Sequence, residues 1–171
     1  STEYLDFAVS DIEGYQDLFV YKNLGATSFF RPNFELLDDW FRGSVPLSPD
    51  FELTCVKKVK TTTLDKLFEN NNLPECELIR LNIQGAELKA IHGGKLVFDS
   101  ALAVQIELSF AETYLGAPMF SDIDPILRKL GFEFFDFLAP NMIGYNEDDA
   151  PTDTNLVWRS PNLRIFESHC L

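Results

Sequence analysis

Basic residues are scarce in this chain. Its 171 residues include 14 Lys and Arg against 27 Asp and Glu, which gives a formal net charge of −13. Nucleic acids and anionic membrane surfaces are bound through clustered positive charge, so this excess of acid argues against both as partners. The one short basic run, Lys57, Lys58 and Lys60, is more typical of a solvated strand face than of a phosphate site.

Long apolar runs and a cysteine framework are also missing. No stretch reaches the roughly 18 apolar residues that span a bilayer, and no signal-peptide pattern opens the chain. The three cysteines, Cys55, Cys76 and Cys170, form no CxxC pair. Their scatter favours a reducing compartment, and we predict a cytoplasmic protein. The two histidines, His92 and His169, have no second ligand at metal spacing, so no metal site is predicted.

The chain contains none of the short motifs that identify common nucleotide and hydrolase sites. GxGxxG, the P-loop, GxSxG and HExxH are all absent from the sequence. Cys55 and Cys76 have no histidine close by in the sequence, which gives nucleophilic cysteine chemistry little support. Any function must therefore be sought in polar residues at the ends of the predicted strands and helices.

What the chain does contain is enough apolar sequence for one core. Its length and its 46% of hydrophobic residues predict a single α/β domain over residues 1–171. Strands alternating with helices imply a mostly parallel sheet, with an antiparallel edge where the last two strands have no helix between them. Strands are predicted at 3–11, 17–24, 54–63, 76–83, 101–110, 132–139 and 154–161, and helices at 62–71, 85–91 and 121–131.

Helix caps can also be predicted. Thr62 stands three residues before Asp65, which is the spacing of a capping box at the start of the first predicted helix. Ser121 or Asp122 is expected to cap the last one, and Gly131 to end it.

Polar residues follow several of the predicted strands. In open α/β sheets, ligands bind beyond the carboxyl ends of the strands. Asp11 could accept a hydrogen bond from a nucleotide-like ligand, or it could simply close a turn through its own backbone. Asn82 and Gln84 can both donate and accept, which suits a ligand that carries amine and carboxylate groups. Glu87 lies in a first helical turn, where a carboxylate is favourable whatever else it does.

Glu107 shares one face of a strand with Gln105. This strand is rich in aliphatic residues on both faces, which predicts a buried central strand. A carboxylate there must be paired, or must lie near solvent at the end of the sheet. Glu107 therefore either acts on a substrate hydroxyl, as an orienting group or a base, or makes a structural hydrogen bond to a neighbouring loop.

Several segments, taken in order, resemble one protein family. "FAVSDIEG" and "GATSFF" are followed by "VKTTTLDKLF", "LIRLNIQGAELKAIHGG" and "VQIELSFAETYLGAPMFSDIDPILRKLGFEFFDF". Together they resemble the FkbM-type methyltransferases, which use S-adenosylmethionine and have a class I Rossmann-like fold. The resemblance implies methyl transfer to a hydroxyl oxygen of a small-molecule or carbohydrate acceptor. It also implies that Ser10 and Asp11 lie near the adenine end of the cofactor. Asn82, Gln84 and Glu87 would lie near its methionine end and the acceptor, and Glu107 further along the same crevice.

Two departures from the family pattern shape the remaining expectations. The family's usual Asp is replaced by Asn82, which cannot act as a base. Either Asn82 only binds and proton removal is left to Glu87, Glu107 or water, or methyl transfer is weakened, and Glu87 and Glu107 are the candidate catalytic residues. The family's glycine-rich strand and loop are expected before Ser1, so we predict a partial methyltransferase domain that lacks its N-terminal strands. Two other interpretations stay open: a non-catalytic α/β interaction or binding module that kept the scaffold and lost the donor site, and a Rossmann-like enzyme that uses another nucleotide.

Overall fold

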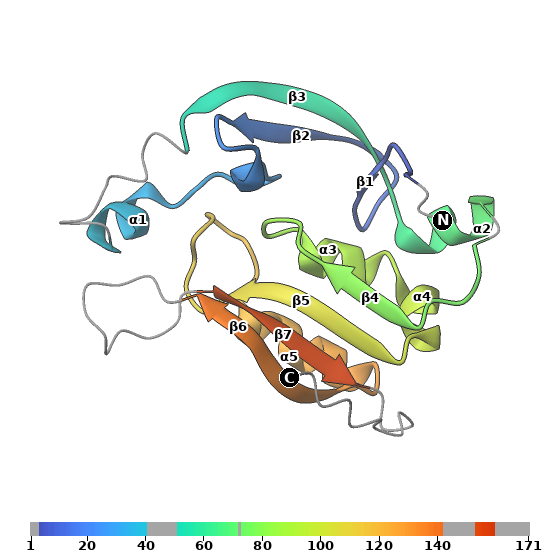
Figure 1. Cartoon of the computed structure of the whole chain (residues 1–171). Helices are drawn as coiled ribbons and strands as arrows, with labels where there is room; N and C mark the ends of the chain where they lie inside the picture. The colour runs from blue at the N-terminus through green and yellow to red at the C-terminus, as the bar shows by residue number, and fades with distance from the viewer. Residues whose placement is uncertain (1–3, 41–50, 72, 142–152, 160–171) are drawn as a thin grey trace.

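The computed structural model describes residues 4–40, 51–71, 73–141 and 153–159. Within these residues the chain forms a mixed α/β structure with two separate sheets (Figure 1). The ends of the predicted strands at 3–11 and 154–161 fall partly outside this range, and His169 and Cys170 lie outside it entirely. The single-domain organisation stays a prediction.

The first sheet has three strands, in the order β1-β3-β2. It consists of β1 (Ala8–Val9), β2 (Gly14–Tyr21) and β3 (Leu53–Thr62). β1 pairs with the end of β3 in parallel, whereas β2 and β3 form a long antiparallel pair. The strand predicted at 3–11 is therefore mostly wrong, because only Ala8 and Val9 find a partner strand. The short basic run on β3 is exposed, as predicted.

The connection from β2 to β3 contains two short helical segments. These are η1 (Leu24–Ala26) and α1 (Phe34–Trp40). The amide N–H of Phe19 on β2 donates to the carbonyl of Ser28 at 2.9 Å, so the chain turns back along β2 directly after η1. This return places the segment that begins at Thr27 beside the edge of the first sheet.

The second sheet has four strands, in the order β4-β5-β7-β6. It consists of β4 (Leu78–Leu81), β5 (Ala103–Ser109), β6 (Glu133–Asn141) and β7 (Asp153–Arg159). β4 and β5 are parallel, and β7 is antiparallel to both of its neighbours. The antiparallel C-terminal edge is thus confirmed.

The prediction of a mostly parallel sheet is confirmed in part for the described strands: β4, β5 and β6 run in one direction, and β7 is inserted between β5 and β6 in the opposite direction. Of the five pairings among all described strands, β1–β3 and β4–β5 are parallel, and the other three are antiparallel. A parallel pair needs a crossover connection that carries the chain back to its starting edge. In the second sheet two helical connections do this: α3 and α4 lie between β4 and β5, and α5 (Phe120–Lys129) lies between β5 and β6.

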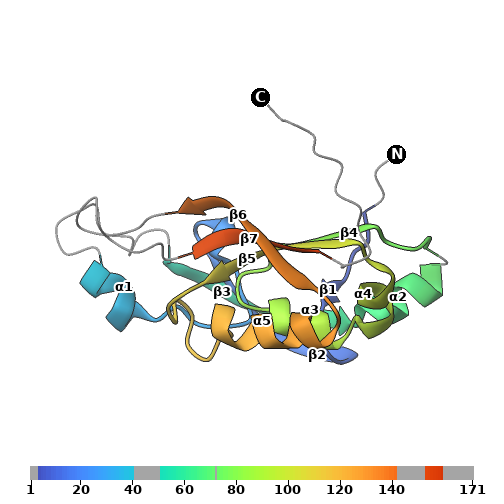
Figure 2. The ribbon, with the colours of Figure 1, turned by 90° about the horizontal axis from the view of Figure 1, so that it is seen from below.

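Three helices cover one face of the second sheet (Figure 2). They are α3 (Glu87–His92), α4 (Lys95–Ser100) and α5 (Phe120–Lys129), and α2 (Leu64–Asn71) packs beside α4. On β5 the buried side chains alternate with half-buried ones, so one face of this strand lies in the core. The strand is therefore less buried than predicted, because only one of its faces is covered by helices. The core residues on this face are Val104, Ile106 and Leu108.

The predicted caps are displaced by one to three residues. Thr63, not Thr62, caps α2, because its Oγ1 accepts a hydrogen bond from the N–H of Lys66 while Thr62 still belongs to β3. Asp122 does not cap α5 but lies in its first turn, where its carboxylate accepts from the N–H of Met119. Gly131 follows the end of α5 with a φ of +91°, as its sequence position predicts.

Gly93 shows why a glycine pair separates α3 from α4. An added Cβ at this position would lie 2.2 Å from the carbonyl oxygen of Ser10, so only glycine allows this approach. The helix predicted at 85–91 does end here, as expected, but α4 follows at once and was not predicted. The contact holds the turn after β1 against the end of α3.

Candidate functional site

A cavity of about 600 Å³ lies between the end of β4, the segment around β1 and the loop that follows η1. Its size is in the range of about 300–1,000 Å³ that small-molecule and cofactor sites occupy. Three of the residues predicted to bind or react line it: Asn82, Gln84 and Glu107. Its other lining residues are Phe7, Ala8, Val9, Leu18, Leu24, Gly25, Thr27, Ser28, Phe29, Ile83 and Ala86.

The turn after β4 has an unusual backbone. Gln84 has a φ of +52°, the one positive value at a non-glycine residue in the described part of the chain, and Gly85 follows with +93°. Such a conformation costs on the order of 1–3 kcal/mol and persists only where the surroundings hold it. Here the hydroxyl of Ser28 donates to the carbonyl of Gln84 at 2.5 Å. Positions of this kind concentrate at functional sites.

The side-chain amide of Gln84 is surrounded by polar partners. Its Nε2 lies 3.0 Å from Oδ1 of Asn82 and 3.4 Å from Oε2 of Glu107. Its Oε1 lies 3.2 Å from the hydroxyl of Tyr114. One amide therefore links the two other predicted residues of the cavity to a residue of the loop that follows β5.

Glu107 reaches the cavity from the half-buried face of β5. Its neighbours Ile106 and Leu108 point into the core, so the strand pleat turns Glu107 to the opposite face. The carboxylate is thus accessible from the cavity and close to the Gln84 amide. This is the position that a base for a bound hydroxyl needs.

Glu87 lies beneath the site and not in the cavity. Its side chain is 2% exposed, and its carboxylate accepts a hydrogen bond of 2.9 Å from the N–H of Ile83. Burial raises the pKa of Glu87 above its ordinary value, and the nearby charge of Glu107 acts in the same direction. Hydrogen bonds from backbone N–H groups, including that of Gly85, oppose this rise without cancelling it. The geometry ties Glu87 to the shape of the turn.

Ser10 and Asp11 stand on the other side of this turn. Ser10 is buried and accepts a hydrogen bond from Gln16, while its hydroxyl donates to Asp11 at 2.9 Å. Burial alone would raise the pKa of Asp11, but the Ser10 hydroxyl, a backbone N–H and Lys89 at 3.4 Å together lower it. Asp11 lines a neighbouring cavity of about 550 Å³, which Gly85 also lines. The structure thus does not bring Asp11 into one cavity with Asn82.

Tyr114 and Ser28 were not singled out by the sequence. Both are buried, and both contact Gln84 across 30 and 56 residues of chain, respectively. "ETYLGAP" belongs to the stretch that resembles the family, but nothing in its local pattern points to a site. Only the folded loops reveal the contact.

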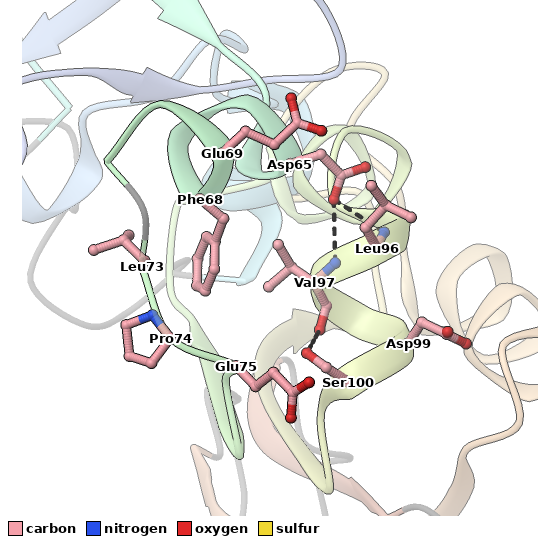
Figure 3. A pocket seen from close by; sticks show the side chains of 10 residues that line it. All are labelled: Asp65, Phe68, Glu69, Leu73, Pro74, Glu75, Leu96, Val97, Asp99 and Ser100. Carbon is pink, nitrogen blue, oxygen red and sulfur yellow. Dashed lines mark hydrogen bonds between the residues drawn. The ribbon is translucent and has the colours of Figure 1, made fainter.

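A third groove lies between α2 and α4 and carries none of the predicted residues (Figure 3). It measures about 460 Å³ and has an apolar floor that includes Phe68 and Val97. One carboxylate oxygen of Asp65 accepts hydrogen bonds from the N–H groups of Leu96 and Val97, at 3.0 and 3.1 Å. These bonds connect α2 to the first turn of α4, where Asp65 caps two N–H groups of that helix. This side of the groove therefore has a structural role.

No group of three or more His, Cys, Asp or Glu side chains in the described residues is placed to hold a metal ion. No helix in the same residues is long and apolar enough to cross a bilayer.

Residues 2–134 match the methyltransferase FkbM domain. This match spans well over half of the 171 residues, and the chain therefore belongs to the FkbM methyltransferase family. The family resemblance of the sequence is thus confirmed, and the domain indicates methyl transfer in general. Neither the curated proteins nor the solved structures contain a match to the chain.

The cavity can be tested against the cofactor that such a domain typically uses. S-adenosylmethionine combines an aromatic base with a charged amino-acid end. The cavity offers Phe7 and Phe29 as aromatic surfaces, and the amide of Asn82 as a polar group. The residues present therefore fit a ligand with one apolar and one polar end.

Proposed function

We propose that this chain forms part of an S-adenosylmethionine-dependent O-methyltransferase with a Rossmann-like sheet. The acceptor in this proposal is a hydroxyl group of a small molecule or carbohydrate. The observation that carries it is the meeting of Asn82, Gln84 and Glu107 in one cavity, in a chain of the FkbM family. Polar groups at the carboxyl ends of β4 and β5 are what ligand binding in an α/β sheet requires.

In this proposal the cavity holds the cofactor and the acceptor side by side. The cofactor supplies an electrophilic methyl group, and the protein's task is to align the acceptor oxygen with it. Asn82 would bind the amino-acid end, because its amide can both donate and accept. Phe29 would lie against the base. Ser10 and Asp11 are proposed for the adenine end, although Asp11 faces the neighbouring cavity.

Proton removal is assigned to Glu107. It is the one carboxylate among the described residues that line the cavity, whereas Asn82 cannot take up a proton at neutral pH. Glu107 would accept the proton that the acceptor hydroxyl loses as its oxygen is methylated. Glu87, predicted as a second catalytic residue, is proposed instead to shape the turn, because its carboxylate is buried and bound to the N–H of Ile83.

The direct test is titration calorimetry of the complete gene product with S-adenosylhomocysteine. We expect saturable binding by the wild-type protein, and similar binding by Glu107→Gln. Formation of S-adenosylhomocysteine from S-adenosylmethionine is then followed with a panel of sugars and hydroxylated small molecules. Glu107→Gln should lower turnover by about 10²–10⁴-fold, the usual contribution of a general base.

Glu77→Gln is the matched control, because Glu77 is exposed and precedes β4. It should leave both binding and turnover unchanged. A wild-type protein that binds no S-adenosylhomocysteine would refute the proposal. Unchanged turnover in Glu107→Gln would remove Glu107 from the proton path while leaving methyl transfer in place.

A second candidate function is a non-catalytic binding module on the same scaffold. Asn82 in place of the family's usual Asp favours it, and its Oδ1 already accepts a hydrogen bond from Gln84. Such a module has lost the donor site, so a folded protein that binds no S-adenosylhomocysteine would support this second function.

A further inference from the structure

The hydrogen bonds through the Gln84 side chain run in one direction. An ionised carboxylate only accepts, so the end of the amide that faces Glu107 at 3.4 Å must be its NH₂ group. Oδ1 of Asn82, at 3.0 Å, accepts from the same group. The amide oxygen then faces the hydroxyl of Tyr114 at 3.2 Å, and this hydroxyl shares its single proton between the Gln84 oxygen and the carbonyl of Ala26. The Glu107 carboxylate thereby fixes the orientation of the Gln84 amide, with its NH₂ group toward Glu107 and its oxygen toward Tyr114.

Tyr114 is held firmly enough to serve as a fixed point. Its side chain is 7% exposed, and its hydroxyl also lies 3.0 Å from the carbonyl of Ala26. The residues on either side of Tyr114 make backbone hydrogen bonds. The N–H of Leu115 donates to the carbonyl of Arg31 at 2.7 Å, and the N–H of Asn33 donates to the carbonyl of Thr113 at 2.9 Å. The loop after β5 is thus joined to the segment after η1 directly at Tyr114.

Ser28 holds the other end of Gln84. The Ser28 side chain is 1% exposed, and its hydroxyl donates to the carbonyl of Gln84 while it accepts from the N–H of Phe30. The donated hydrogen bond holds the backbone of Gln84, which has a positive φ, and the hydrogen bond from Phe30 fixes the Ser28 hydroxyl in the direction that this contact needs. Backbone and amide of one residue are restrained by two loops that are remote in sequence.

We propose that Tyr114 and Ser28 are positioning residues that aim the Gln84 amide at Glu107 and so orient the cavity's carboxylate. Gln84 is then a link within the protein and not a ligand of the cofactor, since both N–H groups of its amide are directed at protein oxygens. Where Glu107 is called a base, this inference rests on the proposed function. The arrangement of the four side chains does not.

The test follows the two Gln84 side-chain amide hydrogens by ¹H–¹⁵N NMR as the pH is changed. Gln84→Met identifies the pair of signals by removing it, and Glu107→Gln shows which part of their pH dependence comes from Glu107. In the wild-type protein we expect the signals to move as Glu107 ionises. In Tyr114→Phe this movement should be largely lost, because the amide oxygen has no donor and the amide can rotate away.

Tyr15→Phe is the matched control, since Tyr15 is 65% exposed on β2 and also loses only a phenolic hydroxyl. In Tyr15→Phe the signals of the Gln84 side-chain amide should move with pH as fully as in the wild type. Ser28→Ala is the second variant, and it should lose the shift even if Tyr114→Phe does not fold. A full shift in a folded Tyr114→Phe, or in Ser28→Ala where Tyr114→Phe does not fold, would overturn the inference. The calorimetric result is independent: failure to bind S-adenosylhomocysteine refutes the proposed function and leaves the NMR signature standing.

Discussion

Replacement of Gly85 by alanine tests the close packing of the turn after β4. An added Cβ would lie 2.9 Å from Cβ of Ala117 and 3.3 Å from Cδ2 of Phe30. The backbone of Gly85 also has a φ of +93°, which costs an L-residue roughly 1–2 kcal/mol. Overpacking typically adds about 1–3 kcal/mol, so Gly85→Ala should lower the free energy of unfolding by about 2–5 kcal/mol.

The chain offers a control with almost the same backbone. Gly131 has a φ of +91°, and nothing lies within 4 Å of a Cβ added there. Gly131→Ala should therefore cost only the backbone contribution, about 1–2 kcal/mol. Urea-induced unfolding of both variants, followed by circular dichroism, gives the difference that belongs to the steric contact alone.

A second change separates the contact from the backbone. Ala117→Gly removes the nearest atom, so in a double-mutant cycle it should recover part of the loss in Gly85→Ala, with a coupling of about 0.5–3 kcal/mol. Equal costs for Gly85→Ala and Gly131→Ala, together with no coupling to Ala117, would refute the described packing. The turn at Gly85 would then not lie against Ala117 and Phe30 as described.

Two further predictions concern Glu87 and Asp65. Because burial raises the pKa of Glu87 in the folded protein, its contribution to stability is fully present below the ordinary glutamate pKa of about 4.3 and is lost as the pH rises through the raised value. Glu87→Gln should remove this loss, so urea midpoints between pH 4 and 8 should fall less steeply with pH than in the wild type, and parallel curves would contradict it. Asp65→Ala should lower the free energy of unfolding by about 0.5–2 kcal/mol, because two N–H groups of α4 lose their acceptor. Asp99→Ala, on the exposed rim of the same groove, should change it by less than about 0.5 kcal/mol, and an equal effect would argue against the cap.

Local sequence patterns predicted the helices better than the pairing of the strands. The helix predicted at 62–71 agrees with α2 within two residues, because its apolar period and its capping threonine are both local features of the segment. Thr62 was preferred to Thr63 because capping-box spacing does not show where the preceding strand ends. The strand at 3–11 failed for the opposite reason: alternation was present, but only Ala8 and Val9 have a partner in β3.

In the candidate site, too, local features could be predicted and contacts between distant segments could not. Asn82, Gln84 and Glu107 could be predicted because parallel neighbouring strands bring their carboxyl ends to one edge, and β4 and β5 are such a pair. Asp11 could not be placed with them by this rule. It follows β1, which belongs to the other sheet, so its position depends on how the two sheets meet.

What the sequence could not provide is the restraint on these side chains. A glutamine after a strand carries no local sign that its φ is positive or that its amide has a fixed direction. That direction arises because Glu107 can only accept, and because the fold brings the hydroxyls of Ser28 and Tyr114 to the two remaining oxygens of Gln84. Since these contacts join three loops, a change in any one loop alters the orientation of Glu107 without touching it. Among substitutions that leave Glu107 itself intact, we therefore expect those in these three loops to lower turnover first.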